Sequence, residues 1–308
     1  MKNIDELNEN LIKEVLKGKK NYISLGNDEL GRNKVMLLPD YNIILKLYGK
    51  KERWEREIAS LKYMESKTLM TPIVKRYGIS SDGKPWVMMT RLEGQTLENV
   101  LEEMNEIQNE NLLYQLGEYQ AYYHEMCRLS YFGDWDINQR ILNRGSSYRE
   151  FTIDKNRKYA ERTISKNHPD TELFKESYNK LIDFERYIDE PTSFSLCHND
   201  FSERNILVKK NSKNTWEISG IVDFEMSYPN DPESDLARML IYNYFKSSKN
   251  SYLNGYTSHR KVTKNFYEKN IYYLLALCLE VSSWAFKSAP DYYNLAKNVL
   301  TDLINRTL

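Results

Sequence analysis

The sequence has few cysteines, no excess of charge of either sign and no long apolar run. The three cysteines, Cys127, Cys197 and Cys278, are far apart and form no Cys-x-x-Cys pair, which argues against a zinc site and a disulfide framework. We expect buried thiols in a reducing cytosol. The 44 basic and 44 acidic side chains cancel, so no net field favours nucleic acid or an anionic membrane.

The apolar segments are also too short for a membrane protein. The longest run covers residues 271–279 and is closed by Glu280, whereas a helix that spans a bilayer needs about 20 apolar residues. The first 20 residues carry scattered charges and no apolar centre, unlike a secretory signal. We predict a cytoplasmic protein, a monomer or weak homodimer, with no nucleic-acid or membrane partner.

The pattern along the chain changes from strand-like to helical after Gly94. Strands followed by helices indicate an α+β architecture with a small sheet-rich lobe and a larger helical one. We predict an N-terminal nucleotide-binding lobe at residues 1–92 and a C-terminal catalytic and substrate-binding lobe at residues 93–308. The predicted strands lie at residues 21–25, 34–38, 42–48, 77–79 and 86–89, with a helix at 51–66. Residues 96–187 and those from 236 onward are helical, with strand-like runs at 194–208 and 216–224 between them.

The densest group of chemically active side chains lies between residues 197 and 205. His198, Asp200 and Asn205 have the spacing His-x-Asp-x-x-x-x-Asn, and Asp223 follows 18 residues after Asn205. The residues between read as strand, turn and strand. We therefore predict a hairpin that returns Asp223 to the side of Asn205.

Phosphoryl transfer explains these residue types. The transferred group is strongly anionic, and Mg²⁺ prefers a few hard oxygen ligands, which Asn205 and Asp223 offer. Asp200 could then accept the proton of the attacking hydroxyl. His198 would support the loop by hydrogen bonding rather than take part in the chemistry.

This combination resembles the protein-kinase-like phosphotransferases, and most closely the aminoglycoside phosphotransferase family. Besides the two motifs above, residues 231–237 resemble the family's Asp-Pro-x-x-Asp-Leu-Ala segment, in which Asp235 is a structural support. The alternative, that these polar residues merely decorate a turn, would not explain three motifs in order. The resemblance implies a bilobal protein-kinase-like fold with a small antiparallel-sheet N-lobe and a larger, mainly helical C-lobe.

Three residues depart from the family pattern. Asn199, Glu225 and Asn230 stand where glycine is common among members. None of these replacements removes a chemical group that the reaction needs. They blur the subgroup, although His-Asn-Asp-Phe-Ser most resembles the 2″-hydroxyl-directed aminoglycoside enzymes.

The nucleotide site is predicted from the N-terminal residues. Lys46 lies inside an apolar strand, and in kinase-like enzymes such a lysine binds the α- and β-phosphates and pairs with a helix glutamate. Glu57 occupies the glutamate position, with Glu55 as the competing candidate. Gly26 and Gly31 resemble a Walker loop but lack the Lys-Ser/Thr that must follow, so we reject a P-loop.

The resemblance assigns further nucleotide contacts. It implies that residues 26–31 form a nucleotide-covering loop, an ordinary hairpin turn being the alternative. It also places Met89 at the gatekeeper position, with the backbone of Thr90 and Leu92 bonded to the purine of ATP or GTP.

The acceptor site should lie in the helical lobe. Glu225, Asp231 and Glu233 follow the metal-binding aspartate and could face an acceptor, while Glu280 and Trp284 lie one helical turn apart and could hold an amine. Alternatively, Glu280 lies on a solvated face. We expect His124 to be structural and His168 and His259 to lie on the surface.

The leading hypothesis is a Mg²⁺-dependent kinase that phosphorylates a hydroxyl of an aminoglycoside-like, amine-bearing antibiotic and so confers resistance. The first rival is a metabolic kinase of the choline, methylthioribose or homoserine type on the same fold. A kinase-like binder without activity and a protein kinase are further alternatives. All four catalytic positions are filled, which argues against the binder.

Overall fold

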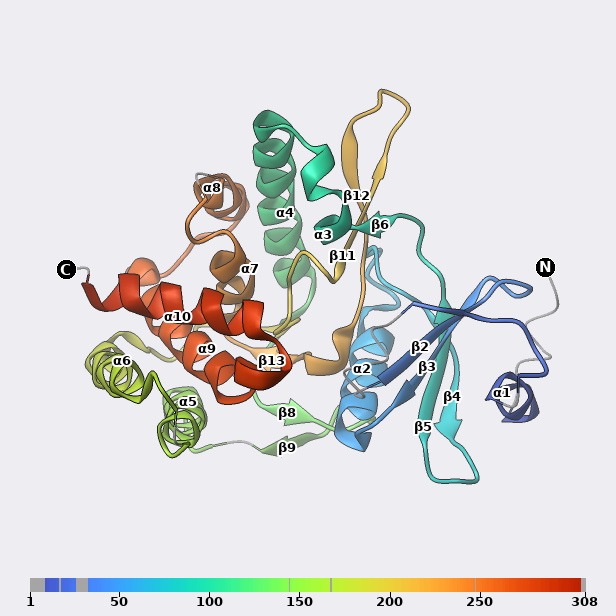
Figure 1. Cartoon of the computed structure of the whole chain (residues 1–308), viewed down its shortest axis with the longest axis horizontal. Coiled ribbons are helices and arrows are strands. Elements are labelled where there is room, and N and C mark those ends of the chain that lie inside the picture. The colour runs from blue at the N-terminus through green and yellow to red at the C-terminus, as the bar shows by residue number, and fades with distance from the viewer. Residues whose placement is uncertain are drawn as a thin grey trace. The chain divides into compact units, whose positions relative to one another are not determined.

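The structure is a computed structural model that describes residues 9–16, 18–25, 33–143, 145–166, 168–246 and 248–305 (Figure 1). The described residues form two compact units. The first unit takes in the described parts of Met1–Leu97, Trp135–Arg140 and Asn205–Ser227. The second takes in those of Glu98–Asp134, Ile141–Arg204 and Tyr228–Leu308. Distant segments of the sequence therefore build each unit, and the lobe boundary between residues 92 and 93 stays a prediction.

An antiparallel five-stranded sheet, in the order β1-β2-β3-β5-β4, forms the centre of the first unit. The predicted strands and the predicted helix are confirmed to within a few residues, whereas the short N-terminal helix was not predicted. The elements are α1 (Glu9–Leu16), β1 (Ile23–Ser24), β2 (Asn33–Leu38), β3 (Ile43–Tyr48), α2 (Lys51–Met64), β4 (Val74–Ile79) and β5 (Pro85–Thr90).

Alternation along β3 directs its side chains to two different layers. Leu45 and Leu47 belong to the apolar core that also contains Ile12 and Val15 of α1. Lys46 lies between them in the sequence and faces α2, because successive strand residues point to opposite faces. Figure 1 shows α1 and α2 on opposite sides of this sheet.

A hairpin completes the first unit. Its strands, β11 (Ile206–Lys210) and β12 (Trp216–Ile221), pair antiparallel, and β6 (Gln95–Thr96) pairs with β11. Gly94 precedes β6 with φ of +124°, and a Cβ there would lie 2.7 Å from the carbonyl oxygen of Val208. Only glycine fits this approach, which explains the break in pattern at that residue. The 3-10 helix η5 (Phe224–Met226) follows the hairpin.

The second unit is mainly helical, as predicted. The long helix α9 packs against α5, α6, α7 and α10, and α4 packs against α8. Gly117 and Gly255 permit the α4–α8 contact, since a Cβ on Gly117 would lie 2.1 Å from the carbonyl oxygen of Tyr252. The helices are α4 (Glu106–Met126), α5 (Tyr148–Ile164), α6 (Thr171–Phe184), α7 (Ala237–Tyr242), α8 (Lys249–His259), α9 (Phe266–Ser288) and α10 (Pro290–Asn305).

A three-stranded sheet, in the order β13-β10-β7, lies among these helices. Its central strand β10 (Phe194–Cys197) leads directly into the His198 loop, and β13 (Tyr228–Asn230) leads into the 3-10 helix η6 (Pro232–Leu236). Because β10 and β13 are neighbours, the residues that follow β10 meet those of η6. The remaining elements are α3 (Leu97–Val100), η3 (Leu101–Glu103), β7 (Arg128–Leu129), β8 (Asp134–Trp135), β9 (Ile141–Asn143) and η4 (Glu185–Tyr187).

Three predictions about single residues can be checked in these units. All three cysteines are buried free thiols, as predicted. The prediction that His168 lies on the surface is wrong: its ring is 8% exposed and its Nδ1 lies 3.0 Å from the hydroxyl of Tyr293. Among the described residues, no helix has both the length and the apolar character needed to cross a membrane.

Candidate active site

A buried lysine lies at the centre of a charge cluster in the first unit. Lys46 is 3% exposed, and its Nζ lies 2.6 Å from Glu57 Oε2, 2.7 Å from Asp223 Oδ1 and 3.2 Å from Glu225 Oε2. Burial alone would lower the pKa of Lys46, but the charges of Asp223, Glu57 and Glu225 outweigh it and raise the pKa well above its ordinary value. The side chain therefore stays an ammonium group.

Glu57, rather than Glu55, is the glutamate that pairs with this lysine. Its Oε2 also accepts a hydrogen bond of 2.6 Å from the Tyr48 hydroxyl, and its Oε1 accepts one of 3.2 Å from the amide of Phe224. Glu55 instead lies 3.4 Å from Lys51 on the same helix. The structure thus resolves the alternative, and it ties α2 to the segment that carries Asp223.

The predicted return of the hairpin is confirmed. Ile206 pairs with Ile221, and the amide of Val222 donates a 2.9 Å hydrogen bond to the carbonyl oxygen of Asn205. Asp223 follows with φ of 67° and ψ of 64°, a left-handed conformation that residues other than glycine, asparagine and aspartate rarely adopt. Strain of this kind persists at functional sites where the surroundings enforce it.

The donor set of this cluster fits a divalent cation. Oxygen atoms of Glu57, Asp223 and Glu225 lie within 4.8 Å of one another, and Lys46 and Arg53 supply only two positive charges against these three carboxylates. Glu57 is 1% exposed and fully engaged, whereas the side chain of Asp223 is 36% exposed. Asp223 therefore offers the accessible hard oxygen that Mg²⁺ prefers.

Glu225, predicted at the acceptor, lies instead in this charge cluster. Its carboxylate is 7% exposed, accepts hydrogen bonds from Arg53 and Asn33, and lies beside Lys46. The sequence reasoning missed Arg53 and Asn33. A signal was available for Arg53, because it precedes Glu57 by four residues and so shares its face of α2.

The loop that carries Asp200 belongs to the second unit and is fixed by Asp235. The carboxylate of Asp235 accepts hydrogen bonds from the amides of His198 (2.8 Å) and Asn199 (2.5 Å), while the amide of Asp200 donates to His198 Nδ1 at 3.2 Å. Asn199 has φ of 59°. These are the contacts of structural supports, the role that the sequence predicted for His198 and Asp235.

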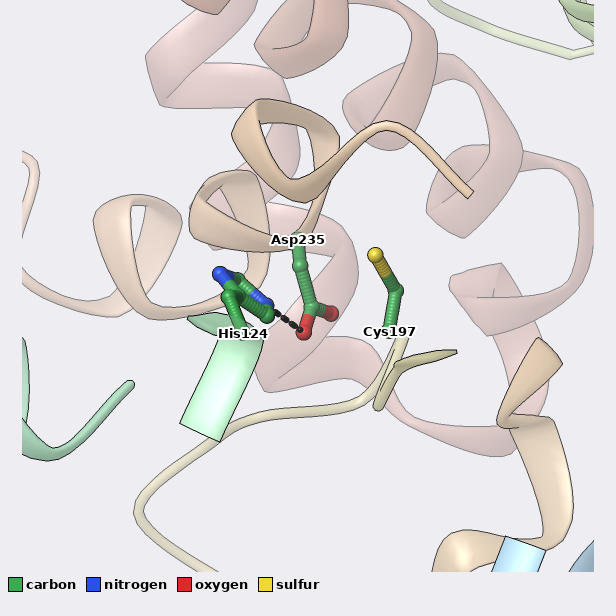
Figure 2. Close-up of side chains that lie close together, drawn as sticks. All are labelled: His124, Cys197 and Asp235. Carbon is green, nitrogen blue, oxygen red and sulfur yellow. Dashed lines mark hydrogen bonds and ion pairs between the residues drawn. The ribbon is translucent and has the colours of Figure 1, made fainter. Parts of the chain in front are cut away.

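His124 and Cys197 surround the same aspartate (Figure 2). His124 Nε2 lies 3.1 Å from Asp235 Oδ2, its Nδ1 lies 3.0 Å from the hydroxyl of Tyr256, and the Cys197 thiol donates to the carbonyl oxygen of Asp231 at 3.4 Å. Burial lowers the pKa of His124 and raises that of Cys197 well above its usual range. A neutral imidazole and a protonated thiol, each already bonded, make a structural cluster rather than a metal centre.

The other predicted acceptor residues fall into two groups. Asp231 and Glu233 are buried, and Lys269 Nζ lies 2.8 Å from Asp231 Oδ2 and 2.7 Å from Glu233 Oε2. These contacts favour a structural role for both carboxylates. Glu280 is partly exposed, its nearest charged partner being Arg238 at 3.6 Å, and Trp284 is partly buried one turn further along α9.

The predicted purine contacts lie at the end of β5. Met89 is buried and pairs with Ile44 of β3. The amide of Thr90 already donates a 3.0 Å hydrogen bond to the Ile73 carbonyl, and the Thr90 hydroxyl accepts one of 2.9 Å from the Ile73 amide. The side chain of Leu92 lies against Gly220 of β12. Gly26 and Gly31 lie outside the described residues.

Comparisons with known proteins agree with this arrangement. The model of the phosphotransferase enzyme family, APH, matches residues 33–263, more than half of the chain. The comparison with curated protein sequences gives no match. Among solved structures, the crystal structure of aminoglycoside phosphotransferase APH(4)-Ia has a TM-score of 0.73 at 14% identity, covering 96% of this chain and 98% of that one.

Two further structures were solved as complexes. The GDP and kanamycin complex of APH(2″)-IIIa has a TM-score of 0.67 at 16% identity and covers 96% of this chain and 98% of that chain. A ternary complex of a thermostable APH(4)-Ia mutant with ADP and hygromycin B has a TM-score of 0.70 at 14% identity, over 95% and 97% of the two chains.

The fold is that of the kinase-like phosphotransferases, as predicted from the motifs. The chain belongs to the phosphotransferase enzyme family, and the predicted likeness to aminoglycoside phosphotransferases is confirmed. Membership supports a kinase-type enzyme.

Proposed function

We propose that this protein transfers the γ-phosphoryl group of ATP or GTP, bound as the magnesium complex, to a hydroxyl of an aminoglycoside-like antibiotic. The observation that carries the proposal is the placement of Asp223 beside Lys46 and directly after Val222, whose amide bonds to the Asn205 backbone. The first unit therefore brings together a cation suited to phosphate groups and carboxylate oxygens suited to a metal ion. We also propose that the protein works in the cytoplasm, where its buried thiols stay reduced.

Each residue of the first unit has a distinct role in this proposal. Lys46, kept charged and oriented by Glu57, binds the α- and β-phosphates. Asn205 and Asp223 would hold Mg²⁺, which neutralises charge on the phosphate oxygens when bound. The backbone of Leu92 would bind the purine, because the amide of Thr90 already bonds within the sheet.

Asp200 is the proposed base in the second unit. It would accept the proton of the acceptor hydroxyl as the phosphoryl group is transferred. The hydrogen bonds that the amides of His198 and Asn199 donate to Asp235 fix the backbone immediately before Asp200, which limits the directions its carboxylate can take. Such fixed positioning supplies much of the rate in phosphoryl transfer.

The acceptor is proposed from two lines of support. Structures similar to this one hold kanamycin and hygromycin B, both aminoglycosides. In this chain, Glu280 and Trp284 put a partly exposed carboxylate and an aromatic ring one helical turn apart on α9, an arrangement suited to an amine. The alternative acceptor class is a small hydroxyl metabolite such as choline, methylthioribose or homoserine.

A phosphate-transfer screen tests the proposal. The full chain is incubated with Mg²⁺ and either ATP or GTP and with kanamycin, hygromycin B, choline, methylthioribose or homoserine. We expect turnover of an aminoglycoside, and we expect Asp200→Asn to reduce it at least 100-fold while nucleotide binding persists. Asp82→Asn, in the exposed turn between β4 and β5, is the control and should keep full activity. Turnover of a metabolite alone would transfer the assignment to the rival class.

A further inference from the structure

Arg238 connects two carboxylates that come from different elements of the second unit. It is the second residue of α7, its Nε lies 3.3 Å from Asp200 Oδ1, and its Nη2 lies 3.6 Å from Glu280 Oε2. The Arg238 side chain is 13% exposed, whereas those of Asp200 and Glu280 are 23% and 25% exposed. The cation is thus the most buried member of the three.

The chemistry of arginine suits this bridge. A guanidinium is planar and presents donors along two edges, so it can face one carboxylate with each edge, which the point charge of a lysine cannot do. Burial alone would lower the pKa of Arg238, but the charges of Asp200 and Glu280 outweigh it and raise the pKa above its ordinary value. Without the guanidinium, two partly buried carboxylates would lose their common counter-ion.

A second guanidinium near Asp200 has other partners. Arg204 Nη2 donates to the Tyr242 hydroxyl at 3.3 Å, and its guanidinium lies over the ring of Tyr292, 4.6 Å from the ring centre. Its charge still acts on Asp200, and it lies within the electrostatic surroundings of Arg238. The ion pair with the Asp200 carboxylate, however, is made by Arg238.

The two ends of Asp200 are therefore held by different residues. His198 accepts the hydrogen bond of its amide, which fixes the backbone, and Arg238 contacts Oδ1, which fixes the side chain. Fixing one oxygen of a planar carboxylate sets the direction of the other. At 3.3 Å this contact is an ion pair without a hydrogen bond from Nε, and catalytic contacts often tighten only when a substrate binds.

We propose that Arg238 is a positioning residue for phosphoryl transfer: it holds the Asp200 carboxylate in its working orientation and is itself braced by Glu280. This inference rests on the proposed role of Asp200 as the base. It gives Glu280 a second task besides contact with an amine, because a change at Glu280 would reach Asp200 through Arg238.

Steady-state kinetics of the full chain provide the first test, with kanamycin and hygromycin B as acceptors. We expect Arg238→Gln to lower kcat by about 10- to 100-fold with little change in KM for the nucleotide. Arg238→Lys should recover part of the lost kcat, because lysine restores the positive charge but not the planar guanidinium. Glu280→Gln should lower kcat as well. A change in the acceptor KM alone would confine Glu280 to acceptor binding and contradict the proposal that Glu280 holds Arg238 in place.

A matched control separates positioning from stability. Arg157 makes a comparable ion pair with the buried Glu185, its Nε lying 2.7 Å from Oε1, on α5 and η4. Arg157→Gln should lose thermal stability and keep wild-type kcat. An Arg238→Gln variant that behaves in the same way would reduce Arg238 to a structural residue and overturn the proposal.

A thermal double-mutant cycle tests the contact without any acceptor. Melting temperatures are measured for Asp200→Asn, Arg238→Gln and the double variant. If the two side chains are coupled as proposed, the double variant loses less than the sum of the single losses. Additive losses would overturn the inference. Failure of the wild type to phosphorylate any acceptor would instead overturn the proposed function, and the cycle would still decide the contact.

Discussion

Replacing Lys46 by methionine tests the central charge cluster most directly. The change removes the cation that lies 2.6, 2.7 and 3.2 Å from three carboxylates, and it leaves in this cluster the guanidinium of Arg53, which pairs with Glu225. Removing one member of a buried pair costs about 3–5 kcal/mol, since the other charge stays buried without compensation. Because 1 kcal/mol shifts the melting temperature of a domain of 150–250 residues by about 2–4 °C, the melting temperature of the variant should lie roughly 10 °C below that of the wild type.

The pH dependence of this loss identifies its cause. The folded-state pKa of Lys46 is raised, so its contribution to stability is fully present below its ordinary value and is lost only as the pH rises through the folded pKa. Wild-type stability from this group is therefore constant between pH 5 and 8. In Lys46→Met the crowded carboxylates take up protons as the pH falls, so the gap between variant and wild type should narrow towards pH 5.

Calorimetry and circular dichroism at several pH values measure this effect. Lys34→Met is the matched control, because this partly exposed lysine of β2 contacts the exposed Tyr22 and should change stability by less than about 0.5 kcal/mol. Adding Glu57→Gln to Lys46→Met should recover part of the lost melting temperature, because it removes one of the uncompensated carboxylates. A wild-type melting temperature for Lys46→Met, or a gap independent of pH, would refute the reasoning.

Three further predictions concern other charged groups. Asp235→Asn should lower both the melting temperature and kcat, measured by calorimetry and initial rates, while nucleotide binding persists. The lost carboxylate accepts hydrogen bonds from the amides of His198 and Asn199, which precede the proposed base Asp200. Because burial lowers the folded pKa of His124, stability from this group is lost as the pH falls from about 6.5, its unfolded value, through the lower folded pKa. A melting temperature that stays flat over that range would contradict this expectation. Glu225→Gly alone should lower the melting temperature because it removes the carboxylate that pairs with Arg53, and Arg53→Gln together with Glu225→Gly should recover part of that loss in a thermal cycle.

Local patterns carried most of the predicted fold. A short run of β-branched, leucine and tyrosine residues placed β3 around Lys46. Helical spacing of apolar residues placed α2 and α4, because a helix that buries one face repeats its apolar residues at that spacing. Strand, turn and strand between Asn205 and Asp223 implied the hairpin, whose return is confirmed by the Val222–Asn205 bond. The helix α1 was not predicted, since two buried side chains, Ile12 and Val15, make a short pattern.

Residue roles that depend on distant partners could not be predicted in the same way. The sequence placed Asp231 and Glu233 near an acceptor because they follow Asp223, the predicted metal ligand. Their buried partner, Lys269, comes from α9, and nothing local announces that pairing. The same applies to Glu225, whose contacts with Asn33 and Arg53 join segments more than 170 residues apart.

Two of the three departures from the family pattern, Asn199 and Glu225, have physical explanations in the structure. Asn199 adopts φ of 59°, and asparagine is among the few residues that tolerate this left-handed conformation, so it can stand where members commonly have glycine. Glu225 also replaces a common glycine, and its buried charge is matched by Arg53 and by the shared ammonium of Lys46. Asn199 thus keeps the backbone conformation that glycine would allow, and the charge of Glu225 is balanced by neighbouring cations. The number of carboxylates around Lys46 is therefore a property of this chain, and it makes the lysine's charge state less sensitive to the loss of any one of them.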